Sequence, residues 1–175
     1  PSIRPAPSSD RTEKREDALV QRDLCELSPV VWQGRLCVMA CVRPASGGSA
    51  EDYYLVLRDA ESGTELARFA TGHGLASAHV QNDTLYVFAS RFEGKNWNDV
   101  TLFKSSDLKN WTQKTVIVQE PTEHLFNSSV CAGPDGFVMA YETDDPTYPA
   151  FTVKFARSTD LENWTKAPEA VFGTN

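Results

Sequence analysis

The carboxyl groups around residue 142 are the first candidates for chemistry. Glu142 ends the apolar run VMAYE, residues 138–142, in which a carboxyl group would need a reason to be buried. Burial would raise its pKa toward the range in which a general acid works. Asp144 and Asp145 follow closely, and Asp144 is a candidate for substrate binding. The alternative is that Glu142 marks the point where a strand emerges into solvent.

The three histidines are also candidates, because histidine titrates closest to neutral pH. His79 lies in a strand-like apolar run, where a lone histidine is either a satisfied core residue or part of a site. His73 and His124 lie in the segments that precede two such runs. His73 and His79, together with the nearby acids, form no recognisable metal motif, and the sequence predicts no metal site.

The cysteines and the known cofactor motifs add no further site. Cys37 and Cys41 lie inside an apolar run, where a free cysteine behaves as a small buried hydrophobe. With Cys25 and Cys131 they follow no metal-ligand spacing, so reduced thiols are favoured over disulfides. No glycine-rich phosphate loop, zinc spacing or Gly-x-Ser-x-Gly elbow occurs. No cofactor is expected.

Composition excludes two classes of partner. The chain has 175 residues, 41% of them hydrophobic, with a net charge of −7. Nucleic-acid binding needs clustered Lys and Arg, so an acidic chain argues against that partner. No apolar run approaches the length of a membrane span. We expect a soluble protein, with the cytoplasm slightly favoured, although the first residue is Pro and localisation stays open.

A repeat indicates which elements position these residues. The segment KSSDLKNWTQKTV, residues 104–116, returns as ARSTDLENWTKAPEAV, residues 156–171, so that Asp107 and Asp160 lie 53 residues apart. A fixed period of this size is typical of repeat architectures. In each copy we expect an Asx-type side chain to cap its own turn and the Trp to pack on the next unit.

The repeat extends to three units when Gly34, Asp83 and Asp135 are aligned. Each unit then contains a first strand, a turn, an apolar second strand, and a third and a fourth strand. The first unit uses DAESGT, residues 59–64, in place of the Trp turn. Four-stranded antiparallel units repeated in this way are the blades of a β-propeller. The sequence therefore predicts an all-β fold with about three blades, at 24–71, 72–120 and 121–175, after a tail at residues 1–22.

Three blades do not close a ring, because propellers have roughly four to eight. Either the chain is part of a longer protein, which we favour, or two chains form a homodimer with six blades.

The turn SSDLKNW, residues 105–111, and its copy STDLENW, residues 158–164, resemble those of the five-bladed propeller glycoside hydrolases, families 43 and 32 and their relatives. The resemblance covers residues 24–173. It implies a carbohydrate ligand and paired carboxyl groups that flank a glycosidic bond. The position of the base, about eight residues before the turn glycine, corresponds to Glu26. The position of the acid in the third blade holds Asn127 instead, which could bind a sugar hydroxyl but cannot donate a proton.

The resemblance leads to one site prediction with two alternatives. Glu26 and Glu142 are the catalytic candidates of a glycoside hydrolase, and no metal is involved. Loop aromatics such as Trp97 could stack on sugar rings. The substrate-binding candidates are Asn127, His79, His124, Trp97 and Asp144. The alternatives are a non-catalytic carbohydrate-binding propeller, suggested by the absence of carboxylates from blade two and from position 127, and a protein-interaction scaffold.

Overall fold

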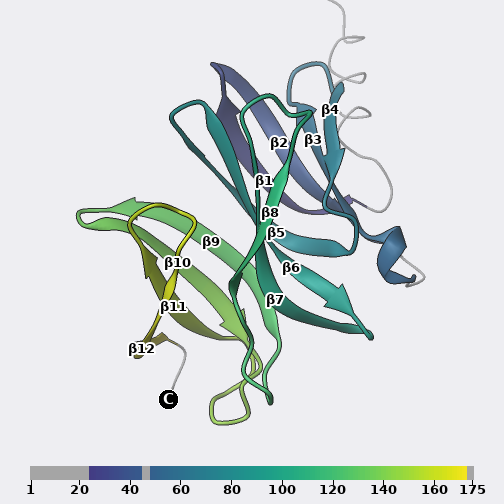
Figure 1. The fold of residues 1–175 in the computed structure, drawn as a ribbon. Coiled ribbons are helices and arrows are strands. Elements are labelled where there is room, and N and C mark those ends of the chain that lie inside the picture. The colour runs from purple at the N-terminus through teal and green to yellow at the C-terminus, as the bar shows by residue number, and fades with distance from the viewer. Residues whose placement is uncertain (1–23, 45–47, 173–175) are drawn as a thin grey trace, which may run out of the picture.

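The computed structural model describes residues 24–44 and 48–172. Twelve strands in this part of the chain form three antiparallel sheets of four strands each, as the sequence predicts (Figure 1). The predicted tail at residues 1–22 lies outside the described residues. None of the described helices is long and apolar enough to cross a membrane.

The strands follow one another in chain order within each sheet, which we call a blade. Blade one contains β1 (Leu24–Trp32), β2 (Arg35–Val42), β3 (Tyr54–Asp59) and β4 (Glu65–Phe69), with the short 3-10 helix η1 (Ala50–Asp52) before β3. Blade two contains β5 (His73–Gln81), β6 (Thr84–Glu93), β7 (Asn96–Ser105) and β8 (Thr112–Ile117). Blade three contains β9 (Leu125–Gly133), β10 (Gly136–Thr143), β11 (Thr152–Ser158) and β12 (Thr165–Phe172).

Strand register confirms the three-unit alignment. The equivalent cross-strand pairs on the first two strands of the blades are Ser28 with Met39, Ser77 with Phe88, and Ser129 with Ala140. The first strands also lie against one another across the blades. The Ser28 hydroxyl donates to the Ala76 carbonyl at 3.1 Å, and the Ser77 and Ser128 hydroxyls are 3.3 Å apart. Three four-stranded blades whose first strands are neighbours form part of a β-propeller.

Two hydrophobic cores join the blades. Along β6, Leu85 and Val87 face blade one, whereas Phe88 faces blade three. This strand is therefore apolar on both faces, which explains why its sequence, TLYVFAS, shows no alternation of polar and apolar residues. In Figure 1 the teal blade two lies between the purple-blue blade one and the green-yellow blade three.

The far face of blade three has no blade against it within the described residues. Phe88 of blade two is fully buried against blade three, but its equivalent Ala140 is only half-buried. Phe151 and Phe172 on blade three are 63% and 72% exposed.

The repeated sequence forms two turns of the same geometry between the third and fourth strands. Asp107 Oδ1 accepts hydrogen bonds from the backbone N–H groups of Lys109 and Asn110 at 2.9 and 2.8 Å. The Asn110 side chain donates to Asp107 Oδ2 at 2.8 Å. In blade three the Asp160 carboxylate accepts the equivalent three bonds at 2.7–2.9 Å. Each Asp therefore caps its own turn, as predicted.

The turn tryptophans pack on the preceding blade, so the expected contact with the next blade is wrong. Trp111 of blade two stacks on Phe69 of blade one, with ring centroids 3.8 Å apart and planes inclined by 10°. Trp164 of blade three meets Phe88 of blade two edge-on at 5.5 Å. Each indole N–H donates to the carbonyl of the turn leucine, Leu108 or Leu161. This bond orients the ring toward the preceding blade.

Candidate functional site

The candidate site lies where the first strand of each blade begins and the second strand ends. We call this the loop end, and the opposite end, which carries the Asp turns, the turn end. Register places Glu26, Leu75 and Asn127 at equivalent positions of the three first strands. Two of them lie in β-bulges with left-handed backbone, with φ of 51° for Glu26 and 53° for Leu75. A bulge redirects its side chain and is common beside functional sites.

Glu26 is half-buried and has two polar neighbours. The Arg43 guanidinium lies 3.4 Å from its Oε1, and the Cys25 thiol donates to its Oε2 at 3.4 Å. Cys25 lies directly opposite Cys41 on β2. Burial raises the pKa of both thiols, and the neighbouring Glu26 carboxylate raises both further. All four cysteines are free.

Glu142 and Asn127 lie together at the loop end of blade three. The Asn127 amide donates to Glu142 Oε2 at 2.9 Å. Glu142 is half-buried rather than enclosed, so the strand does bring this carboxylate to the surface. The two residues that the sequence selected for different reasons therefore form one polar pair.

His124 and Asp144 form a second polar pair at the same end of blade three. The Nδ1 atom of His124 lies 2.7 Å from Asp144 Oδ2, and the His124 backbone N–H also donates to this carboxylate. Burial raises the pKa of Asp144, but these hydrogen bonds outweigh it and hold the pKa below its usual range. The carboxylate and the ring are both about one-third exposed, so a ligand can reach them.

The other two histidines are half-buried and are held by contacts within the fold. His73 is held between the Thr71 carbonyl at 3.0 Å and the Thr101 hydroxyl at 3.2 Å, and burial lowers its pKa. His79 lies two residues before the end of β5, near the turn end, and meets Phe137 edge-on at 5.4 Å. Its Nε2 is buried and has no hydrogen-bond partner among the described residues. The structure therefore does not bring His79 to the loop end.

Trp97 belongs to an aromatic cluster formed by the second and third strands of blade two and by Tyr53, which precedes β3 of blade one. Its ring centroid lies 4.9 Å from that of Phe92 and 5.6 Å from that of Tyr53. A Cβ atom at Gly74 would lie 2.8 Å from the indole, so glycine is needed there. The indole is half-buried, and only the part outside this cluster is available to a ligand.

Sequence reasoning missed a buried ion pair at the loop end. The Glu123 side chain is 1% exposed, and its Oε2 lies 2.6 Å from the Lys154 ammonium and 2.8 Å from the Thr143 hydroxyl. Burial raises the pKa of Glu123, but the bonds from Lys154 and the Glu120 backbone reverse this and leave the pKa low. Lys154 also borders a cavity of about 200 Å³. The partners lie 20 and 31 residues away, so no local motif reveals them.

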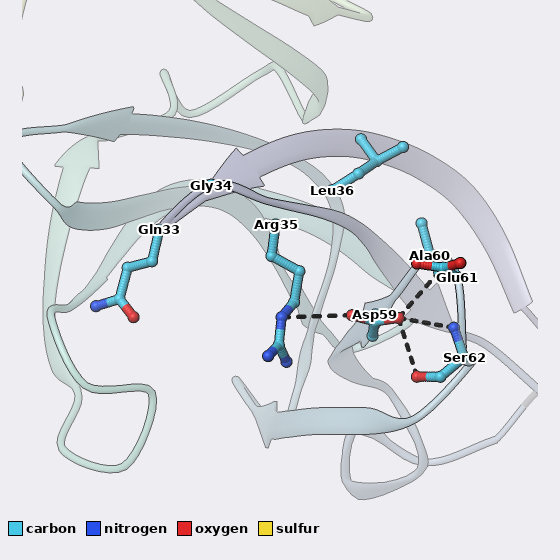
Figure 2. Close-up of a pocket in the computed structure, with 8 residues that line it drawn as sticks. All are labelled: Gln33, Gly34, Arg35, Leu36, Asp59, Ala60, Glu61 and Ser62. Atoms are coloured by element: carbon cyan, nitrogen blue, oxygen red, sulfur yellow. Dashed lines mark hydrogen bonds and ion pairs between the residues drawn. The ribbon is translucent and has the colours of Figure 1, made fainter.

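A larger cavity of about 800 Å³ lies at the turn end of blade one (Figure 2). Its central carboxylate, Asp59, accepts bonds from the backbone N–H groups of Glu61 and Ser62 and faces Arg35 at 3.4 Å. This arrangement is the first-blade counterpart of the Asp107 and Asp160 turns. Because its carboxylate holds the turn, we assign the cavity no catalytic role.

Several solved structures with a similar fold are glycoside hydrolases. A thermostable family-43 glycoside hydrolase matches 87% of this chain with a TM-score of 0.65 and 12% identity. A glycosyl hydrolase from Bacteroides ovatus matches with a TM-score of 0.56 and 14% identity. A structure from the GH130 family, whose members include hydrolases of β-1,2 mannosidic linkages in Candida mannan, matches with a TM-score of 0.52 and 13% identity.

These matches establish the propeller fold that the sequence predicts. The chain spans between 50% and 56% of the length of these three structures. No protein-family model matches the sequence, and no curated protein sequence matches it either.

Proposed function

We propose that this chain supplies part of the active site of a glycoside hydrolase, with the glycan bound at the loop end. The observation that carries the proposal is the position of Glu26. In a fold shared with glycoside hydrolases, a carboxylate occupies the bulge at the start of the first blade and is held by Arg43. Hydrolysis of a glycosidic bond needs two carboxyl groups on opposite sides of that bond.

The roles follow from the neighbours of each group. Glu26 acts as the base or nucleophile, and Arg43 orients its carboxylate through Oε1. Glu142 acts as the acid, with the Asn127 amide fixing one of its oxygens. Asn127 and the His124–Asp144 pair bind sugar hydroxyls, and the exposed edge of Trp97 contacts a ring face. His79 lies at the opposite end of β5 and takes no part in this proposal.

A second candidate function is carbohydrate binding without hydrolysis. It is favoured by the equivalents of Glu26 in the other blades, which are the apolar Leu75 and the neutral Asn127. Only blade one thus presents a carboxylate at this position within the described residues.

Hydrolysis of a panel of chromogenic aryl glycosides, together with calorimetric titration of oligosaccharides, tests both functions. Glu26→Gln and Glu142→Gln keep the shape of the side chains and remove the acid–base group. Each is expected to lower kcat by about 10²- to 10⁴-fold while leaving oligosaccharide affinity within a few-fold. The matched control is Glu169→Gln on the outer strand β12, which removes an exposed carboxylate and should change neither quantity.

The outcomes separate the two functions. Sugar affinity without hydrolysis in the unaltered protein, unaffected by Glu26→Gln, would favour the binding protein. Absence of both, measured with the blades that complete the ring present, would exclude the two carbohydrate functions and leave the interaction scaffold.

A further inference from the structure

A cluster of three metal-ligating side chains lies at the loop end of blade one. The ligand atoms of Cys25, Cys41 and Glu26 all lie within 4.8 Å of one another. Two thiolates and one carboxylate are a ligand set that suits zinc. The sequence conceals the cluster because Cys25 and Cys41 are 16 residues apart and meet only through the pairing of β1 with β2.

The spacing of the ligand atoms suits a tetrahedral ion. Zinc binds thiolate sulfur at about 2.3 Å and carboxylate oxygen at about 2.0 Å, which places two such ligands about 3.5 Å apart at the tetrahedral angle. The distance from Cys25 Sγ to Glu26 Oε2 is 3.4 Å. The two ligands from β1 therefore already have the separation that a shared ion requires.

The surroundings hold the ligands in place. A Cβ at Gly74 would lie 2.6 Å from Cys41 Sγ, so the first strand of blade two passes directly over this thiol. Arg43 contacts Glu26 through Oε1 and leaves Oε2 facing Cys25. Such an outer partner fixes the orientation of a ligating carboxylate.

Charge and access also fit a divalent cation. Two thiolates and a carboxylate carry three negative charges, which one divalent ion and the Arg43 guanidinium would balance. Cys41 is 1% exposed, whereas Cys25 and Glu26 are half-buried, so the cluster is closed on one side and open on the other. Three protein ligands on a tetrahedral ion leave one position for water.

We propose that Cys25, Cys41 and Glu26 form a binding site for one zinc-class divalent ion per chain, open to solvent at its fourth position. The site uses the carboxylate to which the proposed function gives the role of base, but it does not depend on that function. Metal binding is measured without a sugar, so failure of either proposal leaves the other standing.

Titration of the reduced chain with Co²⁺, a spectroscopic substitute for zinc, tests the site. We expect a thiolate-to-cobalt charge-transfer band and the intense visible bands of a tetrahedral ion, saturating at about one ion per chain. Zn²⁺ should displace the Co²⁺ and abolish the bands. Cys25→Ser is expected to weaken binding by at least about 100-fold, and Glu26→Gln by about 10- to 100-fold with the thiolate band retained.

Two matched variants control for other thiols. Cys37→Ser removes a buried thiol from β2, the strand that also carries Cys41. Cys131→Ser removes the exposed thiol of blade three. Both should bind Co²⁺ as the unaltered chain does. The proposal is overturned if no thiolate-to-cobalt band appears, if Cys25→Ser retains it at full affinity, or if Cys131→Ser removes it. Because Cys25 is half-buried, its replacement by Ser should leave the fold intact, which circular dichroism verifies.

Discussion

The two ends of the blades follow different rules. At the turn end, blades two and three repeat the same hydrogen bonds around Asp107 and Asp160, residue for residue. At the loop end, equivalent positions hold Glu26, Leu75 and Asn127, which share no chemistry. The same backbone framework therefore carries a fixed structural device at one end and a variable set of side chains at the other.

This difference suggests that the turn end of each blade mainly stabilises the fold, whereas the loop end carries the residues that bind or react. The turn end closes the third and fourth strands of each described blade, and in blades two and three it also presents an indole to the preceding blade. The loop end faces no such common requirement, so its side chains are free to differ. The simplest expectation is that variants at the turn end unfold the protein, whereas variants at the loop end change only binding or activity.

The largest expected effect breaks this simple division, because it lies at the loop end. Glu123→Gln keeps the shape of the side chain but removes the buried charge that faces Lys154 at 2.6 Å. Removing one partner of a buried ion pair leaves the other uncompensated. We expect the free energy of unfolding in urea to fall by about 3 kcal/mol.

The control for this variant is Glu120→Gln, which removes the exposed partner of Lys166 in the same loop. It should change the free energy of unfolding by less than about 1 kcal/mol. A loss below that value for Glu123→Gln as well would show that Asp145, 2.7 Å from Lys154, suffices to compensate the lysine.

The turn tryptophans give the next largest effect. Trp111→Ala removes the stack on Phe69 and leaves the Leu108 carbonyl without its indole donor. We expect a loss of about 2–3 kcal/mol in the free energy of unfolding, less than for a fully buried Trp because this ring is only partly buried. Trp164→Ala should cost less, because its edge-on contact with Phe88 covers less of the ring face.

Trp111→Phe provides the comparison within the same position. It keeps an aromatic ring over Phe69 but loses the N–H bond, so it should recover most of the stability. Equal losses for the Ala and Phe variants would show that the hydrogen bond, and not the packing between blades, stabilises the turn.

The sequence predicted the turn end well because its contacts are local. Asp107 bonds to groups two and three residues ahead, so the residues SDLKNW contain the whole arrangement except the face on which the Trp packs. That face depends on Phe69, which the repeat does not contain, and the expectation of the next blade was therefore wrong.

The loop end was predicted only in part because its contacts cross between strands. Register alone placed Glu26 and Asn127 at equivalent positions. The pairing of Asn127 with Glu142, 15 residues away, and the ion pair of Glu123 depend on where side chains point at bulges and loop bends. A left-handed backbone at Glu26 has no signal in the sequence, since glycine is the usual residue there.

Acid should weaken the turn end through its carboxylates. Hydrogen bonds from the backbone and side chain of Asn110 hold the pKa of Asp107 well below the usual value in the folded state, and those from the side chain and backbone of Asn163 do the same for Asp160. Their contribution is therefore fully present above the unfolded pKa of about 4 and is lost as the pH falls toward the folded pKa. In the double variant Asp107→Asn and Asp160→Asn, the deficit in unfolding free energy relative to the unaltered protein should shrink between about pH 6 and pH 3.

A deficit that stays constant with pH would mean that the amides replace the carboxylates without a charge contribution. Loop-end acids such as Asp145, whose pKa the Lys154 hydrogen bond lowers to about 2, are present in both proteins and cancel in this difference.

The smallest expected effect comes from an exposed ion pair at the turn end, which can be compared directly with the buried ion pair at the loop end. Lys104 and Glu162 join blades two and three at the turn end at 2.6 Å, the same distance as the Lys154–Glu123 pair, but their side chains are 35% and 42% exposed. An exposed ion pair is screened by solvent and salt. A double-mutant cycle with Lys104→Met and Glu162→Gln should give a coupling of about 0.5 kcal/mol that disappears in about 1 M salt. A coupling as large as that of the buried pair would mean that position between two blades, and not burial, determines how strongly an ion pair stabilises this fold.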